Sequence, residues 1–119
     1  MADGPLSLDI NTDLARQILV EFLRTEVTRA GFKRGVVGVS GGVDSALSCY
    51  LAAEALGPEN VLAVRMPYKT STPDSLEHAD RVVSWTSVKG TLIPITTMVD
   101  ALLEQVPEAE AVRRGNIMA

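Results

Sequence analysis

A glycine-rich octet at residues 38–45 is the feature that most constrains how this 119-residue chain can fold. It reads Gly38-Val39-Ser40-Gly41-Gly42-Val43-Asp44-Ser45. A short apolar run at 35–37 precedes it, and residues 46–54 after it have a helical pattern. The octet is therefore predicted to join a buried strand to a helix. Unpaired amide groups and the positive end of the helix dipole would meet there, which favours binding of an anion.

The side chains of the octet favour a phosphate group as that anion. Gly41 and Gly42 can adopt left-handed backbone angles and lack side chains, so an anion can approach closely. Ser40 and Ser45 add hydroxyl donors. Asp44 would repel phosphate unless a cation lies between them, and Mg²⁺ binds carboxylate and phosphate oxygens together. The alternative interpretation makes Asp44 a helix N-cap and the glycines an ordinary turn.

The octet resembles the pyrophosphate-binding loop of the N-type ATP pyrophosphatases, which include NAD synthetases, GMP synthetases and tRNA-modifying enzymes. It differs from the Walker loop of kinases because no lysine follows its glycines. In this superfamily the loop holds pyrophosphate as a leaving group. The resemblance therefore implies attack on the α-phosphate of ATP and formation of an adenylate.

The hydrophobic pattern predicts alternating strands and helices after an irregular arm at 1–10. The predicted strands are 35–40, 60–66 and 91–95, and the predicted helices are 11–31, 46–56, 73–86, 96–106 and 108–119. Helix-sized connections between successive strands predict parallel pairing and right-handed crossovers. The expected fold class is α/β, a doubly wound parallel sheet that is Rossmann-like. The resemblance refines this to the adenine-nucleotide α-hydrolase type.

Composition restricts the class of protein further. The apolar content of 46% and the charged content of 22% are typical of one soluble globular domain. A net charge of −4 without a basic run argues against a nucleic-acid partner, and no apolar run is long enough to span a membrane. The single cysteine excludes an internal disulfide and suits the cytoplasm, where we expect the protein.

Three other features lead to separate expectations. Leu14, Ile18 and Phe22 lie at helical spacing, with Leu23 and Val27 as further candidates, and this stripe is predicted to pack into the core, with an oligomer contact as the alternative. Residues 67–73 form a polar loop at the sheet edge where open parallel sheets bind ligands. His78 is expected to be a solvated surface residue, because no second histidine or cysteine lies near it to form a metal site.

Two further segments narrow the resemblance to the ammonia-dependent NAD synthetases. They read Arg65-Met66-Pro67-Tyr68-Lys69-Thr70-Ser71 and Arg114-Gly115-Asn116-Ile117-Met118-Ala119. The resemblance implies that residues 38–45 bind the phosphates of ATP, with Asp44 as a magnesium ligand. It also implies that Arg65 contacts the adenylate portion and that Asn116 faces deamido-NAD near a dimer interface. The alternatives are a strand-end charge in solvent for Arg65 and a helix-surface amide for Asn116.

The resemblance implies ATP-dependent amidation of deamido-NAD to NAD by ammonia, in an enzyme that is a homodimer at full length. The chain is expected to be the amino-terminal part of one synthetase domain, with a nucleotide-binding unit at 35–106 and a further helix starting within 107–119. It lacks the family's second magnesium carboxylate, so the chain alone is expected to be inactive. The alternatives are another adenylating enzyme, of the GMP synthetase or tRNA-thiolation type, and a non-catalytic ATP- or AMP-binding module.

Overall fold

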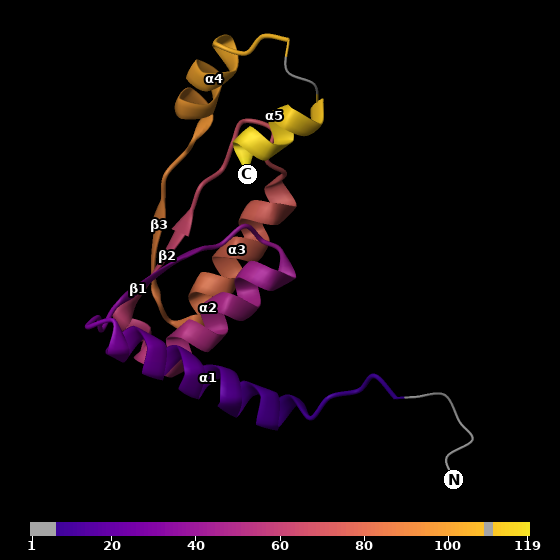
Figure 1. Cartoon of the computed structure of the whole chain (residues 1–119). Helices are drawn as coiled ribbons and strands as arrows, with labels where there is room; N and C mark the ends of the chain where they lie inside the picture. Colours follow the sequence, from indigo (N-terminus) through magenta and orange to yellow (C-terminus); the bar gives the residue numbers. More distant parts are fainter. Residues whose placement is uncertain (1–6, 109–110) are drawn as a thin grey trace.

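The computed structural model describes residues 7–108 and 111–119, and it is built on a three-stranded parallel sheet (Figure 1). The strands, in their spatial order, are β1 (Gly35–Gly38), β2 (Val61–Arg65) and β3 (Lys89–Leu92). The helices are α1 (Thr12–Arg29), α2 (Val43–Leu56), the short 3₁₀ turn η1 (Pro58–Asn60), α3 (Pro73–Thr86), α4 (Thr96–Glu104) and α5 (Ala111–Met118). This is the predicted alternation; residues 1–6 of the predicted arm lie outside the described residues.

Helices α2 and α3 cover one face of the sheet. Both connections step in the same direction across the sheet, so right-handed crossovers place both helices on the same side. The core between these layers consists of Val39, Cys49, Ala53, Val61, Ala63, Ala79, Val82 and Val88. On the other face, Val36 pairs with Leu62 and Leu62 with Lys89, and Val36 is 70% exposed. In the part of the chain that the structure describes, α2 and α3 thus cover one face of the predicted α/β sheet, and Val36 on the other face is exposed.

Helix α1 packs against α2 through only part of the predicted stripe. Leu14, Ile18 and Phe22 are 52%, 58% and 58% exposed, so the prediction that they pack into the core is wrong. The buried or half-buried positions on this helix include Val20, Leu23 and Val27. Leu23 and Val27 are the further candidates of the predicted stripe, whereas Val20 was not predicted. Contact with α2 selects these positions. The Arg24 Nε atom donates a hydrogen bond of 3.2 Å to the Ala55 carbonyl and ties the two helices together.

The second and third strands begin and end at other residues than predicted, and particular side chains explain the differences. Asn60 precedes β2 rather than starting it, because its side-chain amide donates to the Leu56 carbonyl at 2.7 Å and satisfies the end of α2. Strand β3 begins at Lys89 and ends at Leu92 rather than spanning 91–95. Pro94 has no amide hydrogen, so it cannot contribute to a continued ladder on this edge strand.

The last two helices are shorter than predicted. Ile95 occupies the N-cap position of α4, so neither Thr96 nor Thr97 caps that helix. Helix α5 begins at Ala111 rather than at Glu108, and residues 109–110 lie outside the described residues. Both helices lie at one end of the molecule, and α1 lies near the other end (Figure 1). None of the helices in the described part is long and apolar enough to cross a membrane.

Candidate nucleotide-binding site

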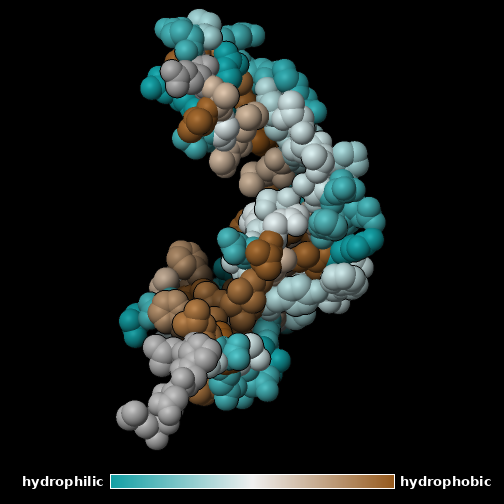
Figure 2. Space-filling model, turned by 90° about the vertical axis from the view of Figure 1, so that its right-hand side faces the viewer, coloured by the Kyte–Doolittle hydropathy of each residue, from teal (hydrophilic) through white to brown (hydrophobic). Residues whose placement is uncertain are grey.

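A cavity of about 410 Å³ lies at the carboxyl end of the sheet. The space-filling view is hollowed between the end of the molecule that carries α4 and α5 and the end that carries α1 (Figure 2). Residues that line the cavity include Gly38, Val39, Ser40, Arg65, Met66, Pro67, Ser71, Ser75, Leu76, Ala79, Ile95, Met118 and Ala119. The fold thus brings together the octet, the loop after β2 and the end of α5.

Gly41 is the position where the turn requires glycine. Its φ is +90°, and a Cβ atom there would lie 2.4 Å from the Ser75 carbonyl oxygen on α3. Left-handed angles and a contact this close are both unfavourable for any other residue. Gly42 has a φ of −84°, so of the two glycines that could adopt left-handed backbone angles, Gly42 does not adopt them. Gly41 therefore allows the octet to pack directly on the first turn of α3.

The two serine hydroxyls of the octet hold the turn itself. The Ser40 amide donates to Ser45 Oγ at 3.1 Å, and Ser45 Oγ donates to the Gly42 carbonyl at 3.2 Å. The Gly42 amide in turn donates to Ser40 Oγ across a longer 3.3 Å. Gly42 is also the N-cap residue of α2, so the alternative interpretation of Asp44 as the N-cap is wrong. The hydroxyls thus fix the shape of the loop, and the first amides of α2 have no partners within the helix.

A second helix N-terminus lies beside the octet. Thr72 caps α3, with its hydroxyl oxygen accepting from the Ser75 amide at 3.2 Å, and Pro73 occupies the first turn. Because Gly41 packs on Ser75, the N-terminal ends of α2 and α3 meet at the same place. Their dipoles add positive potential there. The sequence predicted both helix starts at this sheet edge, but it did not predict their contact.

Arg65 brings a cationic side chain into the cavity wall. It lies at the end of β2, its side chain is only 22% exposed, and it pairs with Asp80 of α3. The alternative of a strand-end charge reaching solvent is therefore wrong. The Nε atom is buried without a hydrogen-bond partner among the described residues. A buried donor of this kind carries a desolvation cost that no described residue offsets.

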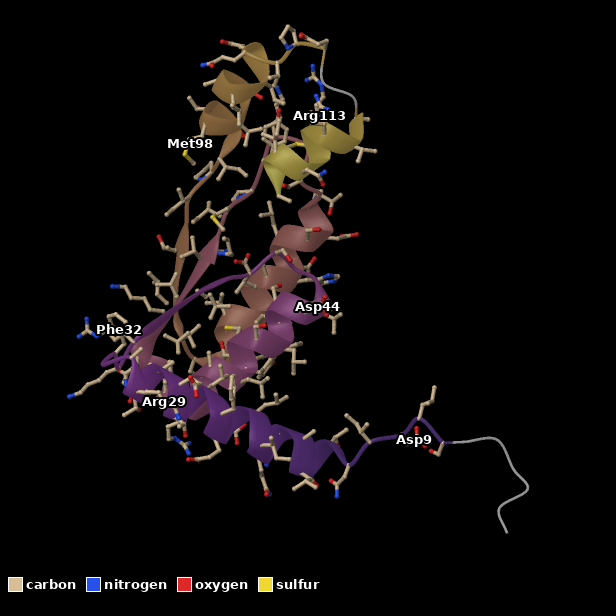
Figure 3. All side chains as sticks on the ribbon, in the orientation of Figure 1. Asp9, Arg29, Phe32, Asp44, Met98 and Arg113 are labelled. Atoms are coloured by element: carbon tan, nitrogen blue, oxygen red, sulfur yellow. The ribbon has the colours of Figure 1, made fainter. Side chains whose placement is uncertain are left out.

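The other predicted site residues lie outside the cavity lining. Asp44, the seventh residue of the octet, is exposed on the first turn of α2 (Figure 3). The described residues contain no group of three or more histidine, cysteine or acidic side chains that could hold a metal. A single carboxylate still fits Mg²⁺, which accepts one or two carboxylates together with phosphate oxygens and water. Asn116 is exposed on α5 and borders a separate hollow with Glu108, Val112 and Arg113.

A polar cluster, which the sequence did not indicate, joins the loop after β2 to helix α4. The Tyr68 hydroxyl donates to Asp100 Oδ1 of α4 at 2.5 Å, and Lys69 Nζ lies 3.1 Å from Asp100 Oδ2. The hydrogen bond from Tyr68 to Asp100 raises the pKa of Tyr68. The separate hydrogen bond from Lys69 to Asp100 raises the pKa of Lys69. The bonds from Tyr68 and Lys69 lower the pKa of Asp100. No local pattern could have revealed the cluster, because 32 residues separate Tyr68 from Asp100.

We expect Tyr68 to lose its proton at a pH above the ordinary tyrosine value of 10.0, because Asp100 stabilises the protonated hydroxyl. Its contribution to stability is complete below that ordinary value and is lost as the pH rises through the raised pKa. Asp100 contributes above its ordinary pKa of 3.8 and loses this contribution as the pH falls through the lowered one. The titration of Tyr68 is measured as the tyrosinate absorbance of the native protein against pH, from which the same curve for Tyr68→Phe is subtracted. A midpoint at or below the ordinary value would contradict the contact.

Comparison with known proteins decides the family. Residues 15–119 match the sequence model of NAD synthase. The chain belongs to the NAD synthase family. It is 54% identical over 112 residues to the NH(3)-dependent NAD(+) synthetase of Trichlorobacter lovleyi, a match that covers 94% of this chain and 41% of that protein. The enzyme of the same name from Chlorobaculum parvum is 47% identical over 115 residues, covering 97% of this chain and 42% of that protein.

Solved structures agree with this assignment. The NH3-dependent NAD synthetase of Campylobacter jejuni, in complex with nitrate, superposes with a TM-score of 0.85 and 31% identity over 93% of this chain and 48% of that one. A glutamine-dependent NAD+ synthetase of Acinetobacter baumannii, in complex with ADP, gives 0.84 and 29% identity over 99% of this chain and 23% of that one. The family indicated by the sequence motifs and the α/β fold class are therefore confirmed.

Proposed function

We propose that this chain carries the ATP site of an enzyme that amidates deamido-NAD to NAD through an adenylate intermediate. The observation that supports this most is the turn at Gly41, where two helix N-termini meet beside a cavity that Arg65 lines. Such a place suits a polyphosphate. The relatives named NH(3)-dependent NAD(+) synthetase support ammonia as the nitrogen donor.

In this proposal the octet binds the β- and γ-phosphates of ATP, which leave as pyrophosphate. The nicotinate carboxylate of deamido-NAD forms a bond to the α-phosphorus as the bond to pyrophosphate breaks. The free amides at the start of α2 and the dipoles of α2 and α3 stabilise the charge that develops on the leaving group. Arg65, which lines the cavity, supplies a positive charge that attracts the α-phosphate of the adenylate. Ammonia then forms the C–N bond, AMP leaves with the carboxyl oxygen, and a proton passes to water.

Asp44 is the residue that we assign to magnesium in this site. When bound there, Mg²⁺ would neutralise charge on the phosphates of ATP. The exposure of Asp44 at the start of α2 supports the assignment, since its carboxylate is open to a ligand. We assign Asn116 to deamido-NAD because it lies on α5, whose last residue borders the cavity.

We also propose that the full-length enzyme is a cytoplasmic homodimer. The exposed Leu14, Ile18 and Phe22 border a surface hollow of about 600 Å³ on α1, and an apolar stripe of this kind favours an oligomer contact. Cys49 is a free, fully buried thiol, which suits a reducing compartment.

The test of this function is NAD formation by the full-length enzyme that carries this chain. We expect NAD to appear only when ATP, magnesium, deamido-NAD and ammonia are all present. One AMP and one pyrophosphate should be released for each NAD formed. Release of ADP and phosphate instead would overturn the proposal, because it would place the attack on the γ-phosphate.

Substitution of Asp44 tests the magnesium assignment. We expect Asp44→Asn to weaken the binding of Mg-ATP about tenfold or more, equivalent to ~1.4 kcal/mol, while the binding of adenosine without metal stays unchanged. Asp13→Asn is the matched control, because Asp13 also lies in the first turn of a helix but on α1. Calorimetry that shows equal losses for Mg-ATP and adenosine would remove Asp44 from the metal site.

A further inference from the structure

One wall of the cavity consists of two chain segments that are hydrogen-bonded to each other. Pro67 and Ser71, from the loop after β2, and Ile95, from the segment after β3, line the cavity. The Ile95 amide donates to the Pro67 carbonyl at 2.9 Å and joins the bases of the two segments. Beyond this bond, the loop is exposed from Lys69 to Pro73, so it has little apolar contact to hold it.

The Tyr68–Lys69–Asp100 cluster supplies the missing support. Tyr68 and Lys69 stand in the chain between the lining residues Pro67 and Ser71, yet they point to Asp100 on α4. Two hydrogen bonds, one donated by each residue, join Tyr68 to Ser71. The Tyr68 amide donates to Ser71 Oγ at 3.0 Å, and the Ser71 amide donates to the Tyr68 carbonyl at 2.8 Å. The position of the Tyr68 ring therefore sets the position of Ser71.

The carboxylate makes this connection stronger than a neutral one. Asp100 is half-buried and receives a hydroxyl donor on one oxygen and an ammonium group on the other. Hydrogen bonds to a charged group are about twice as strong as neutral ones. Lys69 also lies 5.5 Å from the centre of the Tyr68 ring, which restrains the ring from a second side.

We propose that Asp100, Tyr68 and Lys69 form a latch that positions Pro67 and Ser71 against bound nucleotide. The three latch residues do not contact the cavity themselves; they act through the loop, as positioning residues. The inference rests on the proposed ATP site, and it adds a requirement that helix α4 be correctly placed. Loss of the latch leaves the octet and Arg65 intact, so it should weaken nucleotide binding without removing it.

The test is a double-mutant cycle on the affinity of the full-length protein for Mg-ATP. We expect Tyr68→Phe and Asp100→Ala each to weaken binding about fivefold. The double variant should bind no more weakly than Asp100→Ala alone, because that change already removes the acceptor of both Tyr68 and Lys69. Asp100→Asn should rescue binding in part, since its side-chain oxygen still accepts from the Tyr68 hydroxyl. Tyr50→Phe, on α2, is the matched control and should bind as the unaltered protein does.

Denaturant unfolding of the same variants separates positioning from general stability. Affinity losses that persist in variants with unchanged unfolding midpoints support the latch. Losses that simply add in the double variant, or unchanged affinity in both single variants, would overturn it while leaving the ATP site in place. If the unaltered protein does not bind Mg-ATP, the proposed function fails, and the latch fails with it.

Discussion

Gly41→Ala is expected to lower the free energy of unfolding by about 3 kcal/mol, whereas Gly42→Ala should lower it by less than about 1 kcal/mol. At Gly41 a methyl group meets two obstacles at once. The backbone has a φ of +90°, and the new Cβ would lie 2.4 Å from the Ser75 carbonyl oxygen and 2.9 Å from its Cα atom. Both contacts are with backbone, so no side-chain rotation can relieve them.

The neighbouring glycine provides the matched control for that experiment. Gly42 has a φ of −84°, and a Cβ there would lie 3.5 Å from Ser40 Oγ, an ordinary contact. Its replacement costs only the weaker N-cap preference of alanine. Denaturant unfolding of the two variants in the full-length protein makes the comparison. Equal losses at the two positions would contradict the contact between the octet and α3.

Local sequence signals predicted the parts of this fold that depend on neighbours in the chain. The octet was correctly expected to link a strand to a helix, and Gly31, Gly57 and Pro73 lie at helix ends as predicted. These residues act through their own backbone preferences, which no distant contact overrides. The alternation of strands and helices then restricts the topology to a parallel sheet.

The errors arise where distant elements decide between two local solutions. Helix α1 has apolar side chains on more than one side, and the sequence placed Leu14, Ile18 and Phe22 in the core although they are exposed. Only the position of α2 selects Val20 and its neighbours. The same limitation hid the contact of Gly41 with Ser75 and the bond from Tyr68 to Asp100. These contacts join segments 30 or so residues apart, and no spacing rule encodes them.

A polypeptide of residues 1–119 alone is expected to form no measurable NAD, and this is the largest effect on activity that we predict. The described residues supply the phosphate turn, the Arg65 side chain and one carboxylate at Asp44. Asn116, which we assign to deamido-NAD, lies in a hollow apart from the cavity, so these residues do not enclose both substrates together. Correct orientation of reacting groups can account for about 7–11 kcal/mol of a reaction barrier. Loss of even half of that lowers the rate by about three orders of magnitude, at ~1.4 kcal/mol for each factor of ten.

The uncovered sheet leads to a second expectation for the same polypeptide. Val36 is 70% exposed on the face that α2 and α3 leave open, and β1 is an outer strand of the sheet. Uncovered strands of this kind promote self-association, so the short polypeptide should also elute as dimers or larger species. The measurement is the coupled NAD assay on this polypeptide beside the full-length enzyme, with size-exclusion chromatography of both. Comparable turnover from the two would show that residues 1–119 position both substrates unaided, and the division of the site proposed here would then be wrong.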